Sequence, residues 1–164
     1  MVNKYYSRLN LPHPPTSEIL DLETIRSNGN ICPTANIDTK KESIFAVYDV
    51  TPELHSLYQS YFDYDIFMRW QVVTEDLPLH YDWGISPDKY LYLLDTGGDH
   101  VTTKFYSELQ DDPIEGGSFS TEGRTLEYEI HETTKTWFRI NVKTPHQVVG
   151  ITRPRVALII RPVE

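Results

Sequence analysis

The chain has 164 residues, a formal net charge of -9 and a hydrophobic content of 39%. This length fits one domain over residues 1–164, large enough to fold without a disulfide or structural metal. The acidic balance argues against nucleic acid and against an anionic membrane surface as partners. The single cysteine, Cys32, cannot form an intramolecular disulfide, and no apolar leader opens the chain. We therefore expect a cytoplasmic protein. The composition does not indicate its oligomeric state.

The first 42 residues are expected to form an irregular arm, because prolines and a glycine interrupt them, with one short helix near residues 17–25. The pattern over residues 43–50 predicts a strand. Thr51 followed by Pro52 is typical of a helix N-terminus. Apolar residues then recur at helical spacing, which predicts a short amphipathic helix over residues 52–62.

The rest of the chain is predicted to be β-structure, so residues 43–164 form the expected core. Short runs rich in β-branched and aromatic residues alternate with turn signals. Together with the strand over residues 43–50, they give about eight predicted strands: 65–73, 89–94, 101–106, 125–130, 136–142, 146–151 and 155–160. This close spacing favours a sandwich, jelly roll or small barrel over a parallel α/β sheet.

A tight histidine–aspartate pair stands out in this β-rich part. His80 and Asp82 are separated by one residue. In an extended strand, side chains two residues apart point to the same face, so the imidazole and the carboxylate can converge on one point. A metal site at a strand end requires this arrangement, although one His-x-Asp pair is weak evidence by itself.

A second histidine and an arginine complete the pattern downstream. His146 lies between two predicted strands, and Arg155 follows nine residues later at the start of the last strand. An inward-facing arginine at that place is costly unless it meets a carboxylate. Ala157 leaves space beside it on the same face, so Arg155 predicts a pocket for an anionic ligand. Arg153 is the alternative carboxylate partner.

The arrangement His80-x-Asp82, His146 and Arg155-x-Ala157 resembles the iron(II)/2-oxoglutarate-dependent oxygenases, in particular the prolyl- and aspartyl/asparaginyl-hydroxylase-like branches. Two histidines and one carboxylate form the facial triad of non-haem Fe(II) oxygenases, which leaves open positions on the metal. The resemblance covers roughly residues 65–162. It implies a mainly β double-stranded β-helix (jelly roll, cupin-like) with a short N-terminal helical region.

The resemblance also implies the chemistry. His80, Asp82 and His146 would be catalytic and would bind Fe(II), and Arg155 would bind the cosubstrate 2-oxoglutarate. Trp70 and Tyr92 are candidate aromatic contacts to that cosubstrate. The other partners would be dioxygen and a peptide, protein side chain or amino acid that becomes hydroxylated. Further residues are candidates for a substrate mouth: Arg69, Trp83, Trp137, Arg139 and Asn141, together with Trp70.

Two alternatives remain open at this stage. One is a non-catalytic jelly-roll binding or structural protein, in which the histidine and aspartate residues form no working site. The other is a cupin-type metalloenzyme that does not use 2-oxoglutarate. Cupin-like sites usually show a His-x-His pair, and this sequence contains none.

Overall fold

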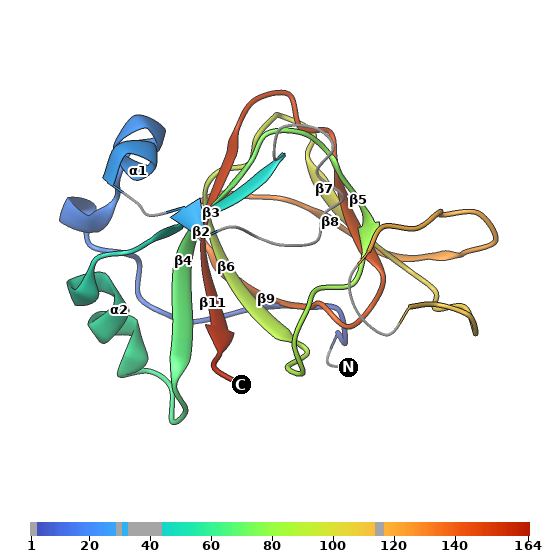
Figure 1. Ribbon diagram of the computed structural model, residues 1–164, viewed down its shortest axis with the longest axis horizontal. Coiled ribbons are helices and arrows are strands. Elements are labelled where there is room, and N and C mark those ends of the chain that lie inside the picture. Colours follow the sequence, from blue (N-terminus) through green and yellow to red (C-terminus); the bar gives the residue numbers. More distant parts are fainter. Residues whose placement is uncertain (1–2, 29–30, 33–43, 114–116) are drawn as a thin grey trace.

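Two antiparallel β-sheets make up most of the protein (Figure 1). The computed structural model describes residues 3–28, 31–32, 44–113 and 117–164. Within these residues the larger sheet has the order β1-β9-β6-β11-β4-β3-β2. Its strands are Tyr6–Arg8 (β1), Trp137–Asn141 (β9), Asp88–Asp95 (β6), Arg155–Pro162 (β11), Ile66–Val73 (β4), Phe45–Asp49 (β3) and Ile31–Cys32 (β2).

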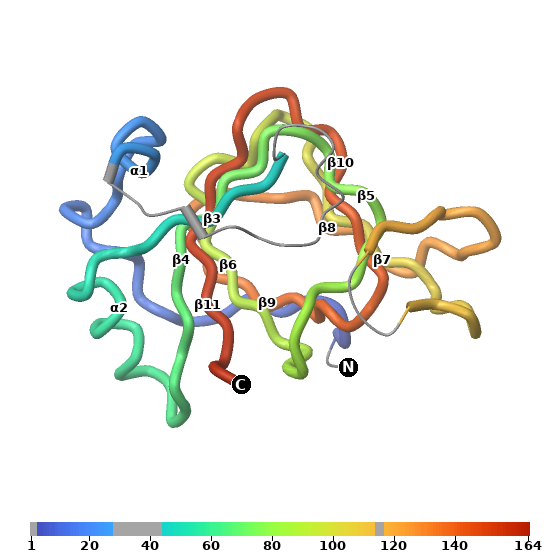
Figure 2. Tube along the Cα trace, in the orientation of Figure 1, coloured from blue at the N-terminus to red at the C-terminus, as the bar shows by residue number. Residues whose placement is uncertain are grey.

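The smaller sheet faces the larger one and has the order β5-β10-β7-β8. Its strands are Leu77–His80 (β5), His146–Val149 (β10), Thr102–Tyr106 (β7) and Leu126–His131 (β8). Figure 2 shows β5 beside β10, although more than sixty residues separate them in the chain. A buried cluster lies between the sheets, with Leu91 and Ile159 from the larger sheet and Phe105 from the smaller one.

The path of the chain identifies the fold. From β4 to β11 the strands pass back and forth between the sheets, so that β4, β6, β9 and β11 lie in one and β5, β7, β8 and β10 in the other. Each sheet therefore interleaves early and late strands, as in a jelly roll. The predicted mainly β fold is confirmed, and its strand order is that of a double-stranded β-helix.

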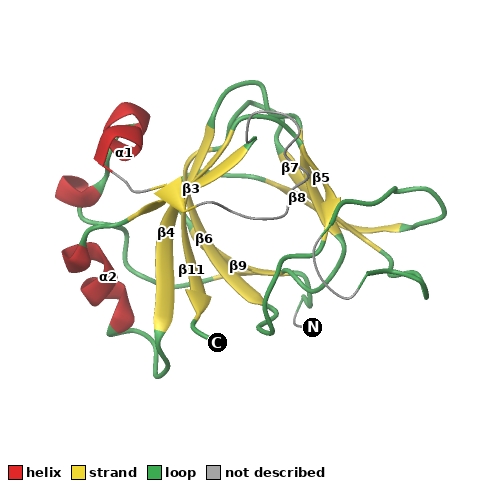
Figure 3. Ribbon diagram, viewed as in Figure 1, coloured by secondary structure: helices red, strands yellow, loops and turns green. Residues whose placement is uncertain are grey.

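Helices cover the outer face of the larger sheet (Figure 3). They are a 3-10 turn at Thr16–Glu18, α1 at Leu22–Asn28 and α2 at Pro52–Gln59. Thr51 caps α2 by accepting a hydrogen bond from the Leu54 amide at 3.1 Å. An outer core of buried residues, among them Tyr58 and Trp70, lies on this face. None of the described helices is long and apolar enough to cross a membrane.

The N-terminal segment is more ordered than its composition suggests. Strand β1 pairs with β9, and β2 pairs with β3, so both extend the larger sheet. Residues 1–42 were expected to form an irregular arm with one short helix near residues 17–25, and the described part of this segment contains the 3-10 turn, α1 and these two short strands. The expected boundary at residue 43 lies outside the described residues.

Candidate metal centre

Strand register brings two histidines together. His80 ends β5 and His146 begins β10, and the antiparallel pairing of these strands sets the two residues directly opposite each other. Directly opposed residues are the closest side-chain neighbours across a sheet. Their ring centroids are 4.4 Å apart. The site is thus built at one end of the smaller sheet, where both strands meet the loop that follows β5.

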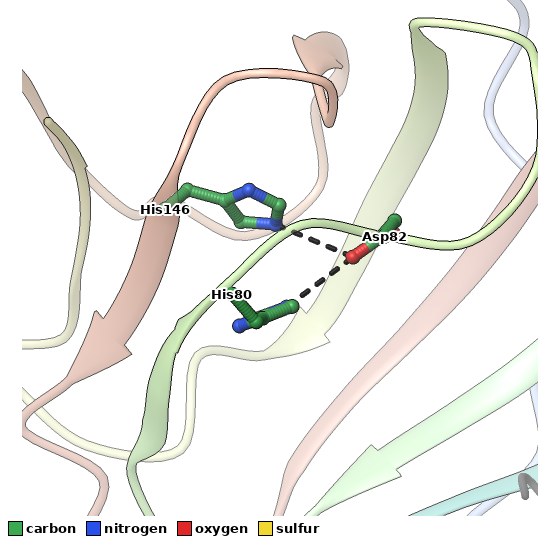
Figure 4. A group of neighbouring side chains, drawn as sticks. All are labelled: His80, Asp82 and His146. Carbon is green, nitrogen blue, oxygen red and sulfur yellow. Dashed lines mark ion pairs between the residues drawn. The ribbon is translucent and has the colours of Figure 1, made fainter. Parts of the chain in front are cut away.

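Asp82 joins the histidines from that loop (Figure 4). Its backbone amide donates to the Val142 carbonyl at 3.2 Å, which fixes the loop against the end of β9. One carboxylate oxygen, Oδ1, lies 3.2 Å from His80 Nε2 and 3.4 Å from His146 Nε2. The three candidate ligand atoms all lie within 4.8 Å of one another, so this group could hold a metal ion.

Hydrogen bonds set the tautomers of the two rings. His80 Nδ1 lies 2.6 Å from the Pro78 carbonyl oxygen, and His146 Nδ1 lies 2.9 Å from the Thr144 carbonyl oxygen. A carbonyl only accepts, so each Nδ1 carries a proton and Nε2 is the ring nitrogen left to bind a metal. The two Nε2 atoms and a carboxylate oxygen of Asp82 face one point. A metal cation at that point satisfies all three, and backbone carbonyls commonly orient ligating histidines in this way.

The electrostatic surroundings keep the ligands in their metal-binding forms. Burial lowers the pKa of His146, which favours its neutral form. Burial alone would raise the pKa of Asp82, but the ammonium of Lys89 holds it well below its ordinary value. Asp82 is therefore a carboxylate. Its second oxygen, Oδ2, accepts a hydrogen bond from Lys89 Nζ at 3.0 Å, which leaves Oδ1 for the metal.

A cavity of about 410 Å³ opens from this group into the space between the sheets. That volume is in the range of small-molecule sites. Most of its wall is apolar, with Leu91, Phe138 and Ile159 from the larger sheet. Its polar lining comes from the three candidate ligands and from a further set of side chains: Gln71, Lys89, Thr103, Ser118, Arg155 and Arg161.

Arg155 lines this cavity and is bound from behind by Glu132. Arg155 Nε donates to Glu132 Oε2 at 2.7 Å, and Nη2 donates to Oε1 at 2.8 Å. The Arg155 side chain is 3% exposed and that of Glu132 is 0% exposed. Thr103 adds a third hydrogen bond to the carboxylate at 2.7 Å. Glu132 itself does not line the cavity. The carboxylate thus takes the Nε–Nη2 edge of the guanidinium, and Nη1 donates a long hydrogen bond to Gln71 Oε1 at 3.5 Å.

The alternative arginine, Arg153, lies elsewhere. Its side chain is 50% exposed and forms ion pairs with Asp95 at 3.2 Å and Asp99 at 3.5 Å. It does not line the cavity that contains the histidines. Of the two arginines considered from the sequence, the structure brings only Arg155 to the site.

The two aromatic residues expected to contact a cosubstrate lie on the wrong side of the sheet. Trp70 and Tyr92 belong to the outer core against the helices, and neither lines the cavity. In β4 the inward positions are those of Phe67 and Gln71, and alternation along a strand sends Trp70 outward. Tyr92 instead contacts His13 Nδ1 at 2.9 Å through its hydroxyl. Of the described residues expected at a substrate mouth, Trp83 alone lines the cavity.

Sequence reasoning missed several polar residues of the cavity. Lys89 and Arg161 occupy inward positions of β6 and β11. Each lies on the same face of its strand as an apolar residue, Leu91 in β6 and Ile159 in β11. A charged residue on an otherwise apolar strand face was a usable signal for both. Glu132 gave no such signal, because it follows the end of β8 in a polar stretch.

Comparison with known proteins gives little beyond this geometry. No protein-family model matches the chain, and no curated protein matches it. Chains of solved structures do match, among them vicilin from Corylus avellana (hazelnut), with 12% sequence identity and a TM-score of 0.43. The match covers 76% of this chain and 30% of the vicilin chain. A likeness at this level carries no argument about function.

Proposed function

We propose that this protein is a non-haem Fe(II)/2-oxoglutarate-dependent dioxygenase that hydroxylates a peptide, a protein side chain or an amino acid. The observation that carries the proposal is the convergence of two Nε2 atoms and one carboxylate oxygen within 4.8 Å, at one end of the cavity between the sheets. Two histidines and one carboxylate suit Fe(II), because they hold one face of an octahedron and leave the other open.

The residues present fit the cofactor and cosubstrate. His80, Asp82 and His146 would hold Fe(II), which with 2-oxoglutarate and dioxygen supplies the oxidation of a C–H bond. Lys89 orients Asp82 from behind, as residues outside the ligand set commonly do. Arg155 would bind the far carboxylate of 2-oxoglutarate through Nη1, which Glu132 does not occupy and which now donates only to Gln71 at 3.5 Å. The apolar walls keep water away from the reacting groups.

Absorption of the anaerobic complex tests this function. Fe(II) and 2-oxoglutarate added together are expected to give a visible charge-transfer band, which neither gives alone. The His146→Ala variant is expected to lose the band, and the exposed His131→Ala variant, in β8, is the matched control that keeps it. Arg155→Ala is expected to weaken 2-oxoglutarate binding and to retain the metal. A wild-type protein that binds Fe(II) but gives no band contradicts the proposed cosubstrate.

A second candidate is a jelly-roll metalloenzyme that does not use 2-oxoglutarate. One observation favours it: the charge of Arg155 is already balanced by Glu132, at distances of 2.7 and 2.8 Å. A structural role would explain that pair without any ligand. Metal uptake without a keto-acid band would favour this function.

A further inference from the structure

Arg161 is a second guanidinium in the cavity, at the opposite end of β11 from Arg155. Residues 155, 157, 159 and 161 alternate onto the inner face of the strand, and Arg155, Ile159 and Arg161 all line the cavity. At about 3.3 Å per residue, the Cα atoms of the two arginines are roughly 20 Å apart along the strand. Arg161 lies at the end that holds the metal ligands, because its Nη1 is 4.0 Å from Asp82 Oδ2.

Within the described residues, Arg161 lacks a carboxylate of its own. Its one hydrogen bond runs from Nη2 to the Ser86 carbonyl at 3.3 Å. The Asp82 oxygen that it approaches at 4.0 Å is already bound by Lys89 at 3.0 Å. Two cations therefore share one carboxylate. Arg155, by contrast, has Glu132 to itself.

The Arg161 guanidinium, which carries this surplus positive charge, is only partly exposed to solvent. The Arg161 side chain is 17% exposed. Trp83, which also lines the cavity, is 48% exposed. A partly desolvated guanidinium that lacks a full partner favours an anion, and its fork of N–H donors matches the two oxygens of a carboxylate. This local excess of positive charge contrasts with the net charge of -9 of the whole chain.

We infer that Arg161 binds a carboxylate of the substrate. The ligand is then an acidic amino-acid side chain or a chain-terminal carboxylate, held next to the metal ligands, while Trp83 contacts its apolar part. The assignment of this ligand as the substrate rests on the proposed function, in which 2-oxoglutarate occupies the Arg155 end. The recognition of a carboxylate by Arg161 does not depend on turnover.

Binding of small peptides to a redox-silent complex tests the inference. The protein is loaded with Zn(II) and 2-oxoglutarate, and titrated calorimetrically with capped tripeptides that carry a central aspartate or glutamate. The matched asparagine and glutamine peptides are the neutral probes, and a glycine peptide with a free C-terminus presents a terminal carboxylate. We expect at least one carboxylate probe to bind about tenfold or more tightly than its neutral counterpart, the size expected for a charge-assisted hydrogen-bonded pair.

Two variants locate the effect. Arg161→Gln is expected to remove the preference for the acidic probe and to leave the affinity for 2-oxoglutarate within about twofold of wild type. Arg139→Gln makes the same change in β9 at a side chain that does not line the cavity, and it is expected to keep the preference. Thermal unfolding of both variants checks that they fold.

Three results would overturn the inference. They are equal or absent binding of acidic and neutral probes, a preference that survives in Arg161→Gln, and a loss of 2-oxoglutarate affinity as large as the loss of peptide affinity. The last result would make Arg161 a cosubstrate ligand. If the iron–keto-acid band is absent but the Arg161-dependent preference is present, the dioxygenase function fails and carboxylate recognition stands.

Discussion

Removing Glu132 is expected to destabilise the protein strongly, because it leaves the Arg155 guanidinium buried without a counter-charge. The Glu132 carboxylate accepts hydrogen bonds at 2.7, 2.8 and 2.7 Å and its side chain is 0% exposed. Breaking a buried ion pair from one side costs about 3–5 kcal/mol. For a chain of this size, each kcal/mol lowers the midpoint of thermal unfolding by about 2–4 °C. Glu132→Ala should therefore lower it by about 10 °C.

Urea and thermal unfolding at neutral pH measure this loss, and three comparisons separate its causes. Arg153, two residues before Arg155 in the chain, forms an exposed ion pair with Asp95. Arg153→Ala breaks that pair and should change the free energy of unfolding little. The double variant Glu132→Leu/Arg155→Met removes both charges and should recover much of the loss. Glutarate, a dicarboxylate without the keto group, should stabilise Glu132→Ala more than wild type, because it supplies the missing anion. A Glu132→Ala protein no less stable than Arg153→Ala would refute the reasoning.

Three smaller effects can be measured with the same assays. A divalent metal at a hundredfold excess over its Kd should stabilise the wild type by about 2.7 kcal/mol, and His80→Ala should lose this gain; an equal gain in both proteins would exclude His80 as a ligand. Arg124 holds the pKa of Asp112 down to about 2. The Asp112 carboxylate therefore adds about 1–2 kcal/mol to the free energy of unfolding; this contribution is fully present above pH 4 and is lost as the pH falls toward 2. Urea midpoints of wild type and Asp112→Asn should thus differ at pH 7 and converge near pH 2, whereas a constant gap would contradict this account. Thr51→Ala removes the cap that accepts the Leu54 amide and should cost about 1 kcal/mol in urea unfolding; no loss would mean that the cap is redundant.

Local patterns were sufficient for most of the larger strands and not for the short ones. Strand β4, expected over residues 65–73, is found at Ile66–Val73, because its β-branched and aromatic residues carry a strong signal. Strand β5, Leu77–His80, was not predicted as a strand, since it has four residues and contains Pro78. Proline is tolerated there because β5 is an edge strand of the smaller sheet. Such placement depends on the partner strand, which local sequence does not reveal.

The same limit applies to the candidate site. His80 and Asp82 are close in sequence, so their proximity could be predicted, although Asp82 lies in the loop after β5 and not on the strand, and register then added His146. Trp70 was assigned to the wrong face, because aromatic character is equally suited to the outer core. Glu132 meets Arg155 from another strand connection, 23 residues away. Pairs of this kind arise from sheet packing and have no local signature.

The two cavity arginines show why a carboxylate partner must be counted before a ligand is assigned. From the sequence, Arg155 is expected to face inward and to need an anion, and Glu132 supplies that anion from within the protein. A ligand at Arg155 must consequently bind a guanidinium whose charge is already balanced, so orientation contributes more there than net attraction. Arg161 shares Asp82 with Lys89 and retains surplus charge beside the metal ligands. At low ionic strength, Arg161→Gln should therefore lose more affinity for anions than Arg155→Gln does, and this difference should shrink as salt is added. Parallel salt titrations of Arg155→Gln and Arg161→Gln measure that difference directly, and identical salt dependence would show that the two ends of the cavity carry the same effective charge.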